Sequence, residues 1–240
     1  MNWFINWFDS PYYHVLYKNR NTKEAQFFID NLISRLKISQ GIRLLDIACG
    51  KGRHSIYFNK KGINVVGIDL SKNNITIAKK NECETLQFVV FDMRKVFRKN
   101  TFDIVTNLFT SFGYFEKDED EQKSITAMAL NLKKGGVLII DFMNVKKVIK
   151  NLIVSETKKV DNITFEIKRS VKNKYIMKDI QISENGKRLC FQEKVKALTL
   201  TDFSKLIHTA GLKIIDIFGD YKLEEFDASK SERLIIICKK

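Results

Sequence analysis

The stretch LLDIACGKGRH, residues 44–54, decides the fold that this 240-residue chain is expected to adopt. An apolar run that favours a buried strand leads into a turn of small residues, and residues 53–61 then favour a helix that stops at Gly62. Gly50 and Gly52 permit a tight turn and a close approach of a ligand to the backbone. The helix that follows offers N–H groups that lack a partner within the helix.

Strand-like and helix-like segments continue to alternate after this turn. Strands are expected at residues 42–47, 63–68, 86–91, 102–108 and 137–142, and helices at 53–61, 71–80 and 119–132. This alternation predicts an α/β protein with a parallel sheet covered by helices on both faces. A helix at 201–210 and strands at 212–218 and 233–238 are expected to complete a seven-stranded sheet.

Two other parts of the chain have different patterns. Residues 21–36 carry apolar side chains at helical spacing, which predicts an amphipathic helix. Residues 154–198 contain the alternating segments 163–167, 175–182 and 189–195, with a strong hairpin signal at Asn185-Gly186. We therefore expect an antiparallel excursion between the fifth strand and the last helix.

Composition narrows the class of protein. A chain with 44% hydrophobic and 29% charged residues is not expected to be disordered. Its four scattered cysteines and three histidines argue against a disulfide framework and a zinc site, and reduced thiols fit a cytoplasmic protein. No apolar run approaches the roughly 20 residues of a membrane span. The aromatic start of the chain lacks a cationic leader, so we do not interpret it as a signal peptide.

The net charge of +14 is concentrated in one region. Residues 145–197 hold 14 Lys and Arg against 6 Asp and Glu. Two interpretations remain open at this stage: a solvated hairpin face in a lysine-rich chain, or contact with an anionic substrate or a nucleic acid.

Four polar residues lie at the expected carboxyl ends of four strands: Asp46, Asp69, Asp92 and Asn107. Ligands of parallel sheets bind beyond these ends. A carboxylate at Asp69 can accept both hydroxyls of a ribose, and Asp92 can accept from an adenine amino group while the N–H of Met93 reaches a ring nitrogen. A dinucleotide fingerprint would require glycine where this chain has Ser55, so the set describes an adenosine site rather than an NAD site.

With these residues in place, the stretch 41–144 resembles the class I S-adenosylmethionine-dependent methyltransferase family. The matching segments are 45–52, 66–71, 91–94 and 132–136, and the tail 201–240 fits the family's last helix and strand pair. The segment LFTSFGY, residues 108–114, is similar to small-molecule N-methyltransferases that act on amino sugars. The resemblance implies a Rossmann-like, doubly wound core at 41–153 and 199–240, an N-terminal lid segment and helix at 1–40, and an antiparallel β insert at 154–198 on the substrate side.

The resemblance also implies a role for each matching residue. The turn residues Ala48, Cys49, Gly50 and Gly52 would line the methionine part of S-adenosylmethionine, and Asp46 would hold its amino group. Asp69 would bind the ribose, and Leu70, Asp92 and Met93 would surround the adenine. Asn107 and Leu108 would stand near the sulfonium, and Tyr17 and Arg20 of the lid would contact the carboxylate. The product would be S-adenosylhomocysteine.

The first hypothesis is a methyltransferase that acts on N or O of a small molecule by in-line displacement, without a metal or a membrane, as a monomer or homodimer. Tyr114 is the candidate catalytic residue; it would orient an amine through its hydroxyl, or else form an aromatic wall of the site. A tRNA or rRNA methyltransferase that uses the basic insert is the first alternative. A non-catalytic module that binds S-adenosylmethionine and regulates a partner is the second, and a dinucleotide oxidoreductase is disfavoured by Ser55.

Overall fold

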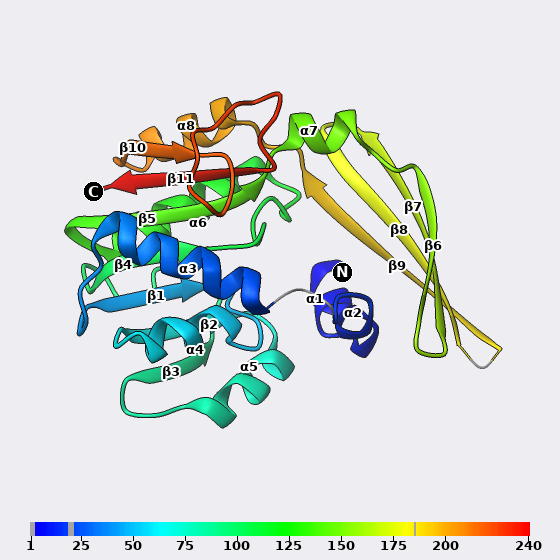
Figure 1. The fold of residues 1–240 in the computed structure, drawn as a ribbon, viewed down its shortest axis with the longest axis horizontal. Coiled ribbons are helices and arrows are strands. Elements are labelled where there is room, and N and C mark those ends of the chain that lie inside the picture. Colours follow the sequence, from blue (N-terminus) through cyan, green and yellow to red (C-terminus); the bar gives the residue numbers. More distant parts are fainter. Residues whose placement is uncertain (1–2, 19–21, 185) are drawn as a thin grey trace.

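A seven-stranded sheet forms the centre of the protein in the computed structural model, which describes residues 3–18, 22–184 and 186–240. The strand order is β10-β11-β5-β4-β1-β2-β3 (Figure 1). The strands are β1 (Arg43–Ile47), β2 (Asn64–Asp69), β3 (Leu86–Val90), β4 (Phe102–Asn107), β5 (Leu132–Met143), β10 (Lys213–Phe218) and β11 (Arg233–Lys239). β11 runs antiparallel to β5 and β10, and the other neighbours pair in parallel. The predicted α/β, Rossmann-like, doubly wound sheet is confirmed.

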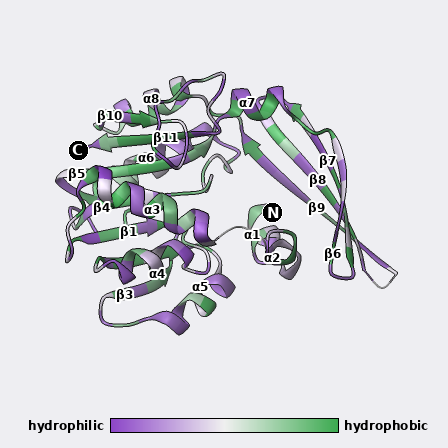
Figure 2. Ribbon diagram, viewed as in Figure 1, coloured by the Kyte–Doolittle hydropathy of each residue, from purple (hydrophilic) through white to green (hydrophobic). Residues whose placement is uncertain are grey.

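Helices cover both faces of this sheet and enclose two hydrophobic clusters. The core helices are α3 (Thr22–Leu36), α4 (Arg53–Lys60), α5 (Lys72–Ala78) with the 3-10 turn η1 (Lys79–Asn81), α6 (Asp118–Asn131), α7 (Val145–Lys150) and α8 (Leu200–Thr209). Leu44 packs with α3, α4 and α5, whereas its neighbour Leu45 packs with α6 and α8, because successive strand residues point to opposite faces. Figure 2 shows the hydrophobic residues along the central strands. None of the helices in these described ranges has the length and apolar composition of a membrane span.

The insert forms a separate antiparallel sheet of four strands in the order β6-β7-β8-β9. Its strands are β6 (Ser155–Val160), β7 (Ile163–Lys172), β8 (Tyr175–Glu184) and β9 (Lys187–Lys196). The three predicted segments lie within β7, β8 and β9. β6 was not predicted, because its sequence SETKKV has no apolar alternation. It pairs with β7 as an edge strand instead.

The N-terminal segment forms two short helices, α1 (Trp3–Phe8) and α2 (Pro11–Leu16), between the core and the insert sheet (Figure 1). Trp7 is fully buried against the insert, where Phe165 and Ile180 pack around it. On the core side, the hydroxyl of Ser71 donates to the carboxylate of Asp9. The segment therefore contacts both neighbours, and its role as a lid stays a prediction.

The insert is tied to the core by Lys196, at the end of β9. Its ammonium lies 2.7 Å from a carboxylate oxygen of Asp118 and 2.7 Å from one of Glu121, both on α6. Its backbone N–H donates to the carbonyl of Gly113 at 2.8 Å. These contacts fix the insert beside the carboxyl ends of the core strands, where the sequence places the candidate site.

Candidate active site

The turn between β1 and α4 contains three residues with left-handed backbone, Ala48 (φ 58°), Gly50 (φ 56°) and Gly52 (φ 83°). A β-carbon on Gly52 would stand 2.6 Å from the ring of Phe88, so packing requires glycine there. A β-carbon on Gly50 would meet no atom within 4 Å. Gly50 thus borders open space, and the backbone is accessible to a ligand at this point.

Asp46 lies beneath this turn and is 1% exposed. The hydroxyl of Ser55 donates to one of its carboxylate oxygens at 2.6 Å, and the hydroxyl of Thr106 donates to the other at 3.0 Å. Burial raises the pKa of Asp46 to about 6, although both hydroxyls stabilise its charged form. Ser55 therefore orients the first acid of the site. Its place in the first turn of the helix after the glycines is the sequence signal for this role.

Asp69 closes the turn from the end of β2. One carboxylate oxygen accepts the backbone N–H of Gly50 at 2.9 Å, and the other accepts that of Ser71 at 2.8 Å. Burial raises the pKa of Asp69, and the two N–H donors act in the opposite direction. The next side chain, Leu70, is 38% exposed. The fixed carboxylate of Asp69 suits the predicted contact with the ribose, and the exposed side chain of Leu70 suits the predicted contact with the adenine.

Asp92 follows β3 and is held by Arg94. The guanidinium Nε lies 3.1 Å from each carboxylate oxygen, and a second guanidinium nitrogen lies 2.9 Å from Asp120 of α6. Burial opposes ionisation of Asp92, but the bonds from Arg94 prevail and lower its pKa. Met93 is partly buried against the core. The adenine roles of Asp92 and Met93 stay predictions. Arg94, which the sequence did not single out, holds Asp92 in place.

Asn107 ends β4 and is fully buried. Its amide nitrogen donates at 3.2 Å to the carbonyl of Ile47, at the end of β1, and at 3.2 Å to that of Ser111. Its amide oxygen has no hydrogen-bond partner among the described residues. The side chain of Leu108 is 3% exposed and packs in the core. At this strand end, Asn107 therefore offers the polar group, and Leu108 is part of the core.

Three further residues were predicted to contact the cofactor: Cys49, Tyr17 and Arg20. The side chain of Cys49 is buried, and burial raises the pKa of its thiol well above the usual value. The hydroxyl of Tyr17 donates to Glu193 of the insert at 2.7 Å, so this residue lies against β9. Arg20 lies outside the described residues. The structure thus assembles the glycine turn with Asp46 and Asp69, and it pairs the hydroxyl of Tyr17 with the insert.

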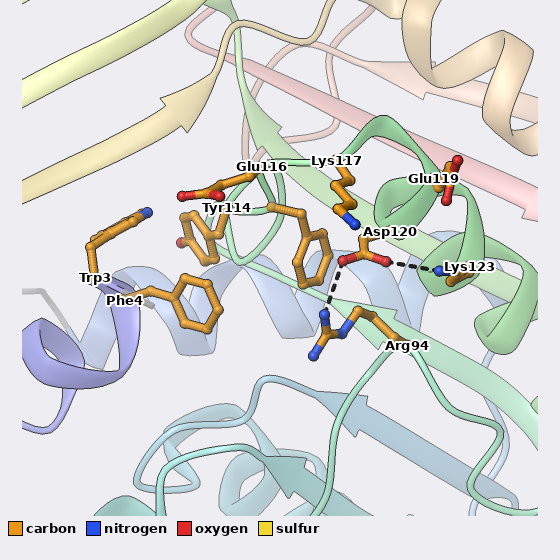
Figure 3. Close-up of a pocket in the computed structure, with 10 residues that line it drawn as sticks. Trp3, Phe4, Arg94, Tyr114, Glu116, Lys117, Glu119, Asp120 and Lys123 are labelled. Carbon is orange, nitrogen blue, oxygen red and sulfur yellow. Dashed lines mark hydrogen bonds and ion pairs between the residues drawn. The ribbon is translucent and has the colours of Figure 1, made fainter. Parts of the chain in front are cut away.

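Tyr114 lies in an aromatic cluster beneath α1. Its ring centroid is 5.6 Å from that of Trp3 and 5.3 Å from that of Phe8, and its hydroxyl donates to the carbonyl of Thr110. The rings of Trp3 and Tyr114 border a cavity of about 330 Å³. Its lining comprises Trp3, Phe4, Arg94, Tyr114, Phe115, Glu116, Lys117, Glu119, Asp120 and Lys123. In Figure 3 the carboxylate of Glu116 lies beside Tyr114, while Asp120 bridges Arg94 and Lys123.

Part of the basic charge of the insert is neutralised inside the protein. Arg169 pairs with Glu156, and Lys178 lies 3.6 Å from Glu193. All four side chains are at most 21% exposed. These cations are therefore not available to an external anionic partner.

Comparison with known proteins shows a shared fold and a matching domain. A solved S-adenosylmethionine-dependent methyltransferase from Clostridium acetobutylicum ATCC 824 shares the fold with a TM-score of 0.79, at 21% identity and 95% coverage of both chains. Residues 45–140 match the family model described as "Methyltransferase domain". Residues 45–140 are therefore a methyltransferase domain.

Two relatives of this methyltransferase are named as N-methyltransferases. The glycine/sarcosine N-methyltransferase of Aphanothece halophytica is 27% identical over 230 residues, which are 92% of this chain and 83% of that protein. The dTDP-3-amino-3,4,6-trideoxy-alpha-D-glucopyranose N,N-dimethyltransferase of Streptomyces venezuelae is 30% identical over 107 residues, 45% of each chain. The second similarity spans about half of that relative.

The geometry of the methyltransferase fits its methyl donor. Gly50 borders open space, and the amide oxygen of Asn107 is buried without a partner among the described residues. Asp46 and Asp69 supply carboxylates for an ammonium group and a ribose, and Leu70 offers an apolar surface for a base. We therefore predict that these five residues bind S-adenosylmethionine.

We expect the affinity of the methyltransferase for S-adenosylhomocysteine to fall about tenfold between pH 7 and pH 5, because Asp46 loses its charge near pH 6 and no longer attracts the ligand ammonium. Calorimetric titration at several pH values measures this change. The variant Asp46→Asn should bind more weakly at pH 7 and show a flat profile. An equally steep profile in the variant would assign the titration to another group.

Proposed function

We propose that this methyltransferase transfers the methyl group to a nitrogen of a small-molecule amine. The observation that carries the proposal is the composition of the cavity beside Tyr114. Four rings line it, together with three acids and three cations: Trp3, Phe4, Tyr114 and Phe115, then Glu116, Glu119 and Asp120, then Arg94, Lys117 and Lys123. Arg94 and Lys123 both pair with Asp120, which leaves the carboxylate of Glu116 beside the rings. Aromatic faces attract cations, and a carboxylate pairs with an ammonium group. Such a lining suits an amine better than a neutral hydroxyl compound.

The chemistry of the acceptor supports the same choice. The lining attracts the ammonium form of the acceptor, which must lose one proton before its nitrogen has a lone pair for attack. An ammonium group gives up that proton far more readily than a hydroxyl compound does, so an amine needs a weaker base than a hydroxyl acceptor. A tyrosine, with a reference pKa of about 10, is a poor base at neutral pH. Because the hydroxyl of Tyr114 donates to the carbonyl of Thr110, its oxygen lone pairs can accept an N–H of the acceptor.

The donor, when bound, supplies a methyl group made electrophilic by the sulfonium. The residues of the chain then have one main task, which is to hold the amine in line with that methyl group. Positioning of this kind is worth up to about 7–11 kcal/mol of the barrier.

A panel of acceptors tests the proposal. The purified protein is incubated with S-adenosylmethionine and with glycine, sarcosine, dTDP-linked amino sugars, their hydroxyl counterparts or tRNA, and products are identified by mass spectrometry. We expect a methyl group on an amine nitrogen. Methylation confined to hydroxyl compounds or to tRNA would replace the proposal with the O-methyltransferase or RNA hypothesis. Binding of the donor with no product from any pool would favour a regulatory module.

Tyr114→Phe should reduce kcat/KM for the amine about tenfold, equivalent to about 1.4 kcal/mol, because the hydroxyl that orients the acceptor is lost. The affinity for S-adenosylhomocysteine should not change. Tyr57→Phe is the matched control, since the hydroxyl of Tyr57 in α4 donates to Asp30 of α3 at 2.9 Å. Full activity in Tyr114→Phe would make Tyr114 a wall residue only.

A further inference from the structure

The loop after β4 has an unusual backbone. Phe109 (φ 56°) and Thr110 (φ 62°) are consecutive and both left-handed, although neither is glycine. This conformation costs an ordinary residue about 1–2 kcal/mol, and it is especially uncommon for a β-branched residue such as threonine. Two such residues in succession persist only where neighbouring groups hold them.

Asp141, at the carboxyl end of β5, holds both residues. Its carboxylate accepts the backbone N–H of Phe109 at 2.8 Å, and its own carbonyl accepts the backbone N–H of Thr110 at 2.9 Å. The side chain of Asp141 is fully buried. One residue therefore fixes two successive peptide groups of the strained turn.

Arg233, the first residue of β11, completes the arrangement. Its Nε donates to Asp141 at 2.7 Å, and a terminal nitrogen donates to the hydroxyl of Thr110 at 3.0 Å. The hydroxyl of Tyr221 donates to the second carboxylate oxygen of Asp141 at 3.2 Å. The guanidinium thus neutralises a buried carboxylate and also contacts the loop directly.

The turn at Phe109 and Thr110 lies between Asn107, which we assign to the methyl donor, and Tyr114, which the proposed function places at the acceptor. Asn107 precedes it, and the amide of Asn107 spans from Ile47 at the end of β1 to Ser111 after the turn. Tyr114 follows it, and the hydroxyl of Tyr114 donates to the carbonyl of Thr110. Any relaxation of Thr110 would therefore displace the phenol oxygen relative to the strand end.

We infer that Arg233 and Asp141 are positioning residues for methyl transfer, which hold the strained Phe109–Thr110 turn so that Tyr114 meets the acceptor at a fixed distance from Asn107. The inference rests on the proposed function for its effect on turnover. Its structural part, the restraint of residues 108–114, does not depend on the identity of the acceptor. Neither Arg233 nor Asp141 is expected to touch the acceptor.

Thr110→Val tests this inference, because it removes the hydroxyl that Arg233 contacts and keeps the Arg233–Asp141 ion pair. We expect kcat for the methylated amine to fall about tenfold with KM for S-adenosylmethionine unchanged, and amide hydrogen exchange in residues 108–114 to rise at least several-fold. Thr110→Ser should restore both values. Exchange in β5 should stay as in the unmodified protein.

Asp103→Asn is the matched control, since Asp103 binds Lys133 at 2.7 Å at the opposite end of β4. It should leave turnover and loop exchange unchanged. If no amine is methylated by the unmodified protein, the proposed function fails while hydrogen exchange still decides the restraint. Unchanged exchange in Thr110→Val, or a loss of turnover that Thr110→Ser does not restore, would overturn the inference.

Discussion

Gly52→Ala should lower the free energy of unfolding by about 3 kcal/mol, which combines left-handed strain with overpacking. The added β-carbon would stand 2.6 Å from the ring of Phe88, which is 1% exposed and closely surrounded by other side chains. For a chain of this size the melting temperature should fall by about 6–12 °C. Thermal unfolding followed by circular dichroism measures the shift. Donor binding should weaken as well, because the turn must move.

Gly50→Ala is the matched comparison, two residues away and also left-handed. Its β-carbon would meet no atom within 4 Å, so only the backbone cost of about 1–2 kcal/mol applies. Its affinity for S-adenosylhomocysteine should fall more than its stability, because the methyl group projects into the space assigned to the donor. Equal losses of stability in the two variants would show that Phe88 does not restrict Gly52.

Arg233→Met should lower the free energy of unfolding by about 3–5 kcal/mol, because it leaves the carboxylate of Asp141 buried without its cation. Urea denaturation measures the change. Lys133→Met is the control: it removes the cation of the Lys133–Asp103 pair, in which Lys133 is 44% exposed. Pairs at the surface contribute about 0–1 kcal/mol, so the control should unfold almost as the unmodified protein does.

The loss in Arg233→Met should also depend on pH. Burial raises the pKa of Asp141, and the charge of Arg233 opposes that rise. Without Arg233 the folded protein favours the protonated carboxyl, so the destabilisation should be largest at pH 8 and smaller at pH 5. Adding Asp141→Asn to the variant should recover part of the stability at pH 8. A loss that is identical at both pH values would exclude the uncompensated carboxylate as its cause.

The sequence predicted most core elements to within a few residues, because each has a local pattern. The exception is β5, which begins at Leu132 rather than at the predicted residue 137. Buried strands such as β1 are apolar runs in the sequence. Ser71 caps α5 as predicted, since its hydroxyl accepts the N–H of Asn74 at 3.0 Å. The helices α1 and α2 were not predicted, because six-residue aromatic segments are too short to show periodicity and gain their stability from tertiary packing. Ser10-Pro11 was the available signal for α2.

The sequence by itself determined the glycine turn, the polar residues at the strand ends and hence the kind of cofactor, because each depends on residues that are close in the chain. Only the tertiary structure decided which partners those residues have. Ser55 and Thr106 meet at Asp46, and Arg233 reaches Asp141 and Thr110, across 92 and 123 positions of sequence. No local pattern encodes such contacts, because they exist only after the sheet has ordered its strands.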